Sequence, residues 1–295
     1  MKGIKIIFKL LKFLIKFILT ILIIVIIGLV GGCIYLNSAY GINVIDVFNQ
    51  LKIMNEEINE NEYIENKFSN EDLDSSKNIS SLNNVINKNG DGTYTIDPDK
   101  ISMLEEDIYL TDKQIGAIVN EIFKKEMEKN GQEYSKYNPE VKEVTFSNIT
   151  PTSTYFTYMV KLDCSSIKEE YNTFPFTLLK NYIPNYLYLS MTSSITHLEK
   201  PFSYEINYVS TKINKLTDEQ TSSFLNTIKN VTQLDFASEI YTSLSTTLIN
   251  LMIGNENYED GFTYSLSKNA LSGVKDYTFK EENGNRYYVI KRGLI

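Results

Sequence analysis

The chain lacks tryptophan, carries a single histidine and has only two cysteines among its 295 residues. One imidazole excludes metal sites built from several histidines and leaves His197 as the only possible histidine base. Cys33 falls in an apolar run and Cys164 in a polar region far along the chain, so no disulfide framework holds the fold together. We predict that His197, in the sequence SSITHLEK, is a surface residue of a strand.

Sequence motifs that carry catalysis or cofactor binding are also missing. The chain has no GxSxG turn, no phosphate-binding P-loop, and neither a GxGxxG nor an HExxH sequence. Acidic neighbours such as Glu169 and Glu170 would point to opposite faces of a strand, which does not suit an acid and base acting together. We therefore predict a protein that is not an enzyme and binds no cofactor or metal.

What the chain does have is an N-terminal stretch suited to a bilayer. Five lysines recur at spacings of three and four and fall within roughly 80° of arc on a helix. Residues 17–36 carry no charge, and as a helix they would rise about 30 Å, the thickness of the hydrocarbon layer. We predict a basic amphipathic segment over residues 1–16 on the anionic inner leaflet, followed by a transmembrane anchor over 17–36. The alternative is one long tilted helix with snorkelling lysines. The lysines are Lys2, Lys5, Lys9, Lys12 and Lys16.

The distribution of charge predicts the orientation of this anchor. Residues 1–16 hold five lysines and no acid, whereas residues 37–75 are rich in Asp and Glu. The positive-inside rule then places the N-terminus in the cytoplasm and the C-terminal domain outside the cell membrane, after a single span. With the five lysines set aside, 24 basic and 37 acidic residues leave a net charge near −13. This charge argues against nucleic acid as a partner.

Two patterns inside the apolar segment leave alternatives open. Gly28 and Gly32 form a small-xxx-small pair that would let two helices approach closely, although such pairs also arise by chance. Residues 30–33, VGGC, resemble the lipobox of bacterial lipoproteins, in which cleavage precedes a lipid-bearing cysteine. Because residues 34–36 continue the apolar run, we favour Cys33 as a lipid-facing residue of an uncleaved anchor.

Residues 37–89 are predicted to be an acidic, Asn-rich stalk. Residues 44–53 suit one short amphipathic helix, but the following sequence, NEEINENEYIENKFSNEDLDSS, is too charged to bury much apolar surface. We expect this segment to be extended or only partly ordered. Such a stalk would hold a folded domain away from the membrane.

The loop at residues 87–97 has two interpretations. Asn87, Asn89 and Asp91 precede a glycine and imitate the first half of a calcium-binding loop, in which oxygen ligands alternate. Pro98 stands where that loop would need a bidentate glutamate. The sequence GDGTYTI therefore favours a turn that enters a strand, with calcium binding as the alternative.

Residues 90–295 are predicted to form the folded domain. Two similar pentapeptides, LTDKQ at 110–114 and LTDEQ at 216–220, each place Thr as the N-cap and Gln three residues later. This capping box satisfies the first free amides of a helix, so each pentapeptide predicts a helix start. A third helical stretch is expected at 237–252.

The regions around these helices alternate between apolar and polar residues, as strands do. Together with a terminal hairpin around EENGN, they predict an antiparallel meander packed against helices, an α+β fold. The expected strands lie at 144–149, 152–163, 186–198, 202–213, 277–279 and 287–290.

This order of elements resembles a known family. An anchor, a stalk, a helix opening with LTDKQIGAIVNEIF, long alternating strands and a second helix opening with INKLTDEQTSSFL are similar to the YpmS-type anchored proteins of Gram-positive bacteria and to the wider tubular lipid-binding superfamily. The resemblance covers residues 100–290. It implies a strongly curved sheet wrapped around a helix, with an apolar groove for a lipid tail. No residue role carries over, and the helical stretch at 237–252 departs from the family pattern.

Two functions follow as expectations. The first is a membrane-anchored extracellular module that binds lipid or another hydrophobic ligand, with one strand face as the groove lining. That face consists of Phe156, Tyr158, Val160 and Leu162. The alternative is an envelope module that binds a protein or a wall polymer through tyrosine-rich strands and has no ligand cavity. A hollow apolar interior would favour the first function, and a filled core with exposed aromatic side chains the second.

Overall fold

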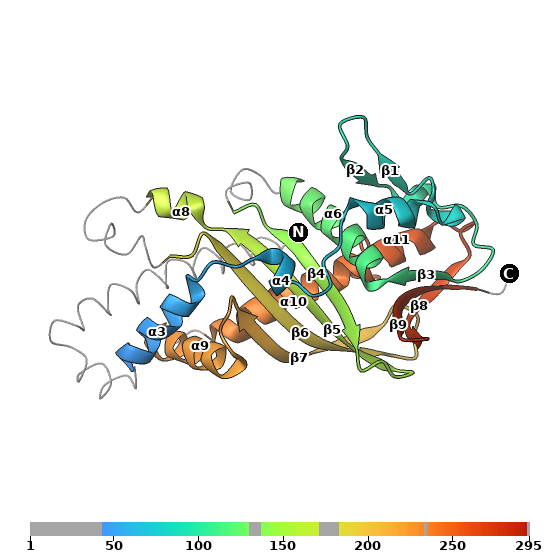
Figure 1. Ribbon diagram of the computed structural model, residues 1–295. Helices are drawn as coiled ribbons and strands as arrows, with labels where there is room; N and C mark the ends of the chain where they lie inside the picture. Colours follow the sequence, from blue (N-terminus) through green and yellow to red (C-terminus); the bar gives the residue numbers. More distant parts are fainter. Residues whose placement is uncertain (1–42, 130–136, 171–182, 233–234, 294–295) are drawn as a thin grey trace.

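The computed structural model describes residues 43–129, 137–170, 183–232 and 235–293. These residues build an α+β fold with antiparallel sheets and flanking helices, in agreement with the predicted fold class (Figure 1). In chain order the elements are α3 (Val44–Met54), α4 (Glu60–Tyr63), α5 (Asn70–Lys77), η2 (Ser80–Leu82), β1 (Ile86–Lys88), β2 (Tyr94–Ile96), η3 (Pro98–Lys100), β3 (Ile108–Thr111), α6 (Asp112–Lys129), β4 (Glu140–Ser147), β5 (Ser153–Asp163), α8 (Ser165–Glu170), β6 (Tyr186–His197), β7 (Tyr204–Ile213), α9 (Asp218–Thr232), α10 (Phe236–Met252), α11 (Phe262–Lys268), β8 (Val274–Glu282) and β9 (Asn285–Arg292).

The largest sheet has four antiparallel strands in the order β4-β5-β6-β7, so the predicted meander is confirmed. Strands β5 and β6 pair without interruption from Ser153 opposite Thr196 to Asp163 opposite Tyr186. The outer strand β7 contains an extra residue, Val209, that has no partner on β6. Such a bulge twists an edge strand and makes it a poorer template for pairing with another chain.

A second, three-stranded sheet has the order β3-β9-β8 and contains the predicted C-terminal hairpin. Asn283 and Gly284 both adopt positive φ angles, 53° and 78°, as a tight two-residue hairpin turn requires. Strand β3 was not predicted because it has only four residues and runs directly into α6. The domain therefore has separate sheets where the sequence suggested one.

Both predicted capping boxes are present. The backbone N–H of Gln114 donates to the Thr111 hydroxyl over 3.3 Å, and the Gln114 side chain accepts from the Thr111 N–H over 2.9 Å. Thr217 and Gln220 make the same two contacts at the start of α9. The third predicted helix is also confirmed, as α10. Local side-chain chemistry was therefore sufficient to locate these helices.

The predicted stalk is wrong for residues 43–89, because these residues belong to the folded domain. On α3 the side chains of Val44, Val47, Leu51 and Met54 are buried in the same apolar cluster as the inner sheet face. Leu73, Leu82 and Ile86 follow them into this core. The segment is polar on average, but the few apolar residues of α3 recur at helical spacing, and most of the charged residues of the segment are exposed. The average composition of residues 43–89 therefore did not reveal the amphipathic pattern of α3.

The N-terminal predictions lie outside the described residues. Over the ranges that the structure describes, no helix has the length and apolar composition needed to cross a bilayer. The surface segment 1–16 and the anchor 17–36 therefore stay predictions. The same holds for the individual residues named in them, which are Lys2, Lys5, Lys9, Lys12, Lys16, Gly28, Gly32 and Cys33.

Helix α3 offers a matched test of whether this segment belongs to the domain. Leu51 is 0% exposed and Ile45, on the same helix, is 67% exposed. We expect Leu51→Ala to lower the free energy of unfolding by about 2–5 kcal/mol, because it leaves a cavity in the core. Ile45→Ala is expected to change it by less than about 0.5 kcal/mol. Denaturant unfolding of both variants checks this, and equal stabilities would restore the stalk interpretation.

Candidate functional site

The strand face predicted to line a lipid groove lies in the packed core. Phe156, Tyr158, Val160 and Leu162 are each at most 2% exposed. Tyr158 also shares a hydrogen bond of 2.6 Å with Ser245 on α10, which covers this face. If these side chains lined a groove wide enough for an acyl chain, part of their surface would be accessible to solvent. These four residues therefore act as core residues of β5 in this structure.

The opposite face of the sheet is crossed by residues 55–67, which we call the N-terminal strap. The strap includes α4, and the Asn66 amide donates to the Val144 carbonyl of β4 over 2.8 Å. Ile64 of the strap packs with Met159 and Tyr188 of the sheet in a small buried cluster of their own. The strap therefore covers part of the sheet face that the core does not use.

Asn214 ties the start of this strap to the sheet. It is buried, follows β7 and has a positive φ of 48°, a conformation that asparagine tolerates well. Its side chain donates to the Met54 carbonyl over 2.5 Å and accepts from the Tyr188 N–H over 2.8 Å. Its backbone carbonyl accepts a hydrogen bond from the Tyr63 hydroxyl. One residue thus links α3, the strap and β6.

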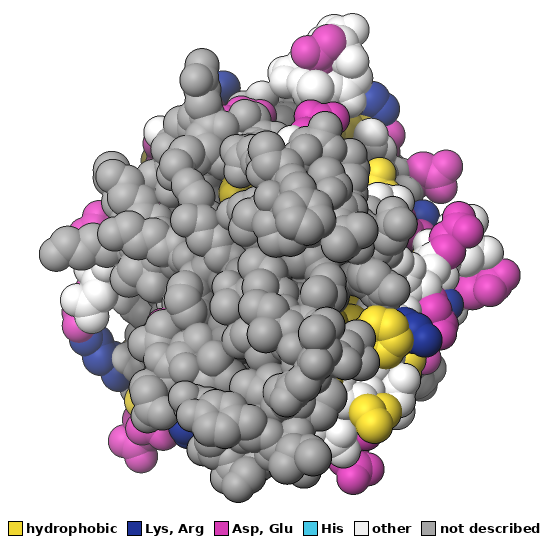
Figure 2. Space-filling model, turned by 90° about the vertical axis from the view of Figure 1, so that its left-hand side faces the viewer, with side chains coloured by type: hydrophobic (Ala, Val, Ile, Leu, Met, Phe, Trp, Pro, Cys, Tyr) yellow, Lys and Arg dark blue, Asp and Glu magenta, His cyan; other side chains and the backbone are white. Residues whose placement is uncertain are grey.

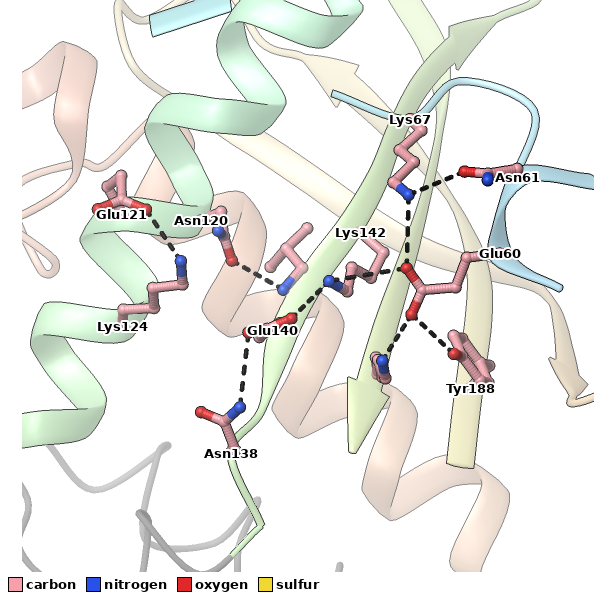
Figure 3. Close-up of polar contacts among 12 residues, drawn as sticks. Glu60, Asn61, Lys67, Asn120, Glu121, Lys124, Asn138, Glu140, Lys142 and Tyr188 are labelled. Atoms are coloured by element: carbon pink, nitrogen blue, oxygen red, sulfur yellow. Dashed lines mark hydrogen bonds and ion pairs between the residues drawn. The ribbon is translucent and has the colours of Figure 1, made fainter. Parts of the chain in front are cut away.

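Glu60, on the strap, is the centre of a cluster of charges (Figure 3). Its carboxylate accepts hydrogen bonds from the Lys161 ammonium over 2.6 Å and from the Tyr188 hydroxyl over 2.9 Å. Lys67 and Lys142 lie 3.6 and 3.9 Å from its second oxygen. Glu60 falls within the predicted stalk, and nothing in its local sequence indicates that three lysines surround it. The lysines come from the strap, β4 and β5.

The surroundings of Glu60 change its acidity. Burial would raise its pKa, but the hydrogen bonds from Lys161 and Tyr188 and the nearby charge of Lys142 outweigh burial and lower the pKa to about 2. Burial and the adjacent carboxylate raise the pKa of Tyr188. Glu60 is therefore ionised at any physiological pH. Its ion pairs attach the strap to the sheet, and it does not donate a proton.

Beside this cluster lies a surface concavity of about 380 Å³. Tyr186, which is 43% exposed, and Tyr188 form its aromatic side. The Lys161 ammonium lies 4.0 Å from the centre of the Tyr186 ring, a cation–π contact that fixes the ring. The remaining wall is mostly polar and consists of Asn55, Glu56, Glu57, Ile58, Pro184 and Asn185. This combination of an aromatic platform with amide and carboxylate groups can hold a polar ligand.

His197 is the last residue of β6, as predicted, but it is not a freely exposed residue. Its Nε2 atom lies 3.0 Å from an Asp276 carboxylate oxygen on β8, and its ring packs edge-on against Tyr277. The other Asp276 oxygen accepts from the Phe202 N–H over 2.9 Å. The contact joins the two larger sheets, so His197 has a structural role there.

The loop at residues 87–97 is the β1–β2 hairpin, so the predicted turn is confirmed. Its Asp91 carboxylate accepts from the Thr93 N–H over 3.0 Å and from the Thr93 hydroxyl over 2.6 Å. Gly92 adopts a φ of 85°. In the part of the chain that the structure describes, no group of three or more His, Cys, Asp or Glu side chains is placed to hold a metal ion.

Asp112 is the most deeply buried carboxyl with a strongly changed acidity. Burial raises its pKa to about 6, and the Arg286 guanidinium, 2.9 Å away, opposes that shift. Its second oxygen has no hydrogen-bond partner among the described residues. Asp112 stabilises the contact between α6 and β9 through this ion pair. Its side chain is only 5% exposed, so it is poorly accessible from solvent.

Comparison of the chain with protein-family models, with curated proteins and with solved structures finds no match. The resemblance to the YpmS-type and tubular lipid-binding proteins therefore stays a prediction.

The Glu60 cluster predicts a specific pH dependence. Because the pKa of Glu60 is lower in the folded protein than its usual value of 4.5, its stabilisation is present above about pH 4.5 and is lost as the pH falls toward 2. We expect Glu60→Gln to lower the free energy of unfolding by roughly 1 kcal/mol at neutral pH. The difference from the unmodified protein should vanish near pH 2.

Thermal unfolding between pH 2 and 7 measures this dependence. Glu62→Gln is the matched control, because Glu62 lies on the same short helix and accepts from Asn59 at its N-cap. A Glu60→Gln curve parallel to that of the unmodified protein over the whole pH range would show that the cluster contributes nothing.

Proposed function

We propose that the protein is a membrane-anchored, extracellular binding module of the cell envelope that recognises a wall polymer on its surface and has no enzymatic activity. The observation that carries the proposal is the concavity beside Tyr186, set on a sheet whose opposite face is filled by core residues. The expected N-terminal anchor and the acidic exported part support the location.

The chemistry of the concavity suits a sugar chain. The face of an aromatic ring carries negative charge density, which attracts the weakly positive C–H groups of a sugar ring. The carboxylates of Glu56 and Glu57 accept hydrogen bonds from hydroxyl groups, while an amide such as that of Asn185 both donates and accepts. A few polar groups around an aromatic platform set orientation and specificity.

Rigidity also supports recognition by this surface. The Tyr186 ring is held by Lys161, which is itself held by Glu60 on the strap. A side chain that is already fixed loses little conformational freedom when a ligand binds. The surface is therefore preorganised for binding.

Two exposed tyrosines allow a matched binding test. Tyr186 is 43% exposed with Lys161 over its ring, and Tyr109 on β3 is 39% exposed with Lys280 over its ring at 5.3 Å. We expect Tyr186→Ala to weaken binding to purified Gram-positive cell walls by about 30-fold, the effect of losing an interface hot spot of about 2 kcal/mol. Tyr109→Ala should leave binding unchanged.

Co-sedimentation of the full-length protein in detergent with purified walls measures this binding. Equal loss in both variants would mean that the contact is not at the concavity. Absence of binding by the unmodified protein would overturn the wall-polymer proposal. Retention that is removed by treating the walls with protease would point to an envelope protein as the partner instead.

The lipid-binding prediction has its own test, at Val160. If Val160 is a core residue, Val160→Trp overpacks the interior and lowers the free energy of unfolding by about 1–3 kcal/mol or more. The soluble fragment for this test must start at residue 43, because α3 supplies part of the core. Tyr155→Trp, at an exposed position of the same strand, should have little effect.

The unfolding measurement is combined with extraction of lipid from both purified variants and the unmodified fragment. We expect the stability loss in Val160→Trp and no lipid in any sample. Lipid that accompanies the unmodified fragment and is lost in a stably folded Val160→Trp variant would reinstate the lipid-binding module.

A further inference from the structure

Few residues separate the predicted membrane span from the folded domain. The predicted span ends at residue 36, and the folded domain begins with the N-cap of α3 at Asn43. At about 3.3–3.6 Å per residue, residues 37–43 reach at most about 25 Å. A stalk of 53 residues, 37–89, would have allowed on the order of 180 Å. The domain is therefore confined to the membrane surface if the anchor spans the bilayer.

Helix α3 is the part of the described domain nearest to that anchor along the chain, and one of its faces is unused by the core. Ile45, Asn49 and Lys52 are exposed on it, and the exposed Asp46 lies at its border, about 100° from Ile45 around the helix. Ile45 and Lys52 are seven residues apart, which places them within about 20° of each other around the helix. The Lys52 ammonium lies 4.5 Å from the ring centre of Phe48, which extends the apolar part of this face.

This pattern fits the interface of a bilayer. An isoleucine that is 67% exposed loses contact with water when it enters the boundary between headgroups and acyl chains, and a lysine beside it meets lipid phosphates. Figure 1 places α3 at one end of the molecule, away from α11 and β8. Figure 2 looks onto this end, and at its edge a hydrophobic side chain lies beside a basic one, with acidic side chains nearby.

We propose that the domain rests directly on the outer leaflet, with the α3 face of Ile45, Asn49 and Lys52 in contact with lipid headgroups. This inference rests on the anchor in the proposed function, but it does not depend on what the Tyr186 concavity binds. It also suggests what the strap does. Because Asn214 and Glu60 fasten the strap to the sheet, a domain that is seated through α3 has a defined orientation to the membrane.

Fluorescence quenching of the full-length chain in vesicles tests the contact. In a Cys33→Ser background, single cysteines are introduced as Ile45→Cys, Leu271→Cys and Ile24→Cys and labelled with an environment-sensitive fluorophore. Leu271 is 79% exposed and lies between α11 and β8, at the far end of the molecule. The unmodified Cys164 is buried, and the background protein without an added cysteine measures its labelling.

The vesicles contain phosphatidylcholine and phosphatidylglycerol, with a nitroxide either on the lipid headgroup or in the middle of the acyl chain. We expect the headgroup nitroxide to quench the label at position 45 at least about threefold more strongly than the label at 271. The mid-chain nitroxide should quench the label at 24, within the predicted anchor.

The three labels separate the possible failures. Strong quenching at 24 with equal, weak quenching at 45 and 271 would overturn the seating of α3 and leave the anchor intact. Weak quenching at 24 would overturn the anchor, and with it the seating proposal. Binding of cell walls through Tyr186 is measured separately, so its failure cannot be mistaken for either result.

Discussion

The hydrogen bonds of one buried asparagine hold the N-terminal part of the domain to its sheet. A buried amide is costly unless each of its polar groups is paired, and Asn214 pairs its side chain with Met54 and Tyr188 while its backbone carbonyl accepts from Tyr63. These bonds fix where α3 ends and where the strap starts across the sheet. The position of Glu60 between its lysines depends on this attachment of the strap.

The two faces of the four-stranded sheet differ in composition and packing. The face toward α6 and α10 is filled with apolar side chains, so its role is to supply the stability of the fold. The other face carries hydroxyl, tyrosine and lysine side chains and is partly covered by the strap. Because buried side chains fill the interior beside β5, this packing supports the proposal of recognition at the surface of the sheet. The unpaired residue Val209 in β7 also makes the outer strand less open to pairing with other chains.

Local patterns in the sequence were enough for much of the fold. Alternating residues located the long strands, and the boxes at Thr111 and Thr217 located two helix starts within a residue, because both depend on neighbours a few positions apart. The sequence did not predict that residues 43–89 are folded, because their apolar residues are sparse and elements such as α3 and α5 pack on α9 and α6, which lie far along the chain. The candidate site was missed for the same reason. Glu60 contacts Lys161 and Tyr188, and no local signal connects them.

The sequence by itself determined the α+β class, the meander and the hairpin, and it still provides the whole argument for a basic N-terminal segment and a membrane anchor. Only the tertiary structure decided which face of β5 is core, that residues 43–89 belong to the domain, and which charges meet at Glu60. The physical reason is the range of the interactions. Periodicity and capping act over a few residues, whereas burial and ion pairing depend on segments that only folding brings together.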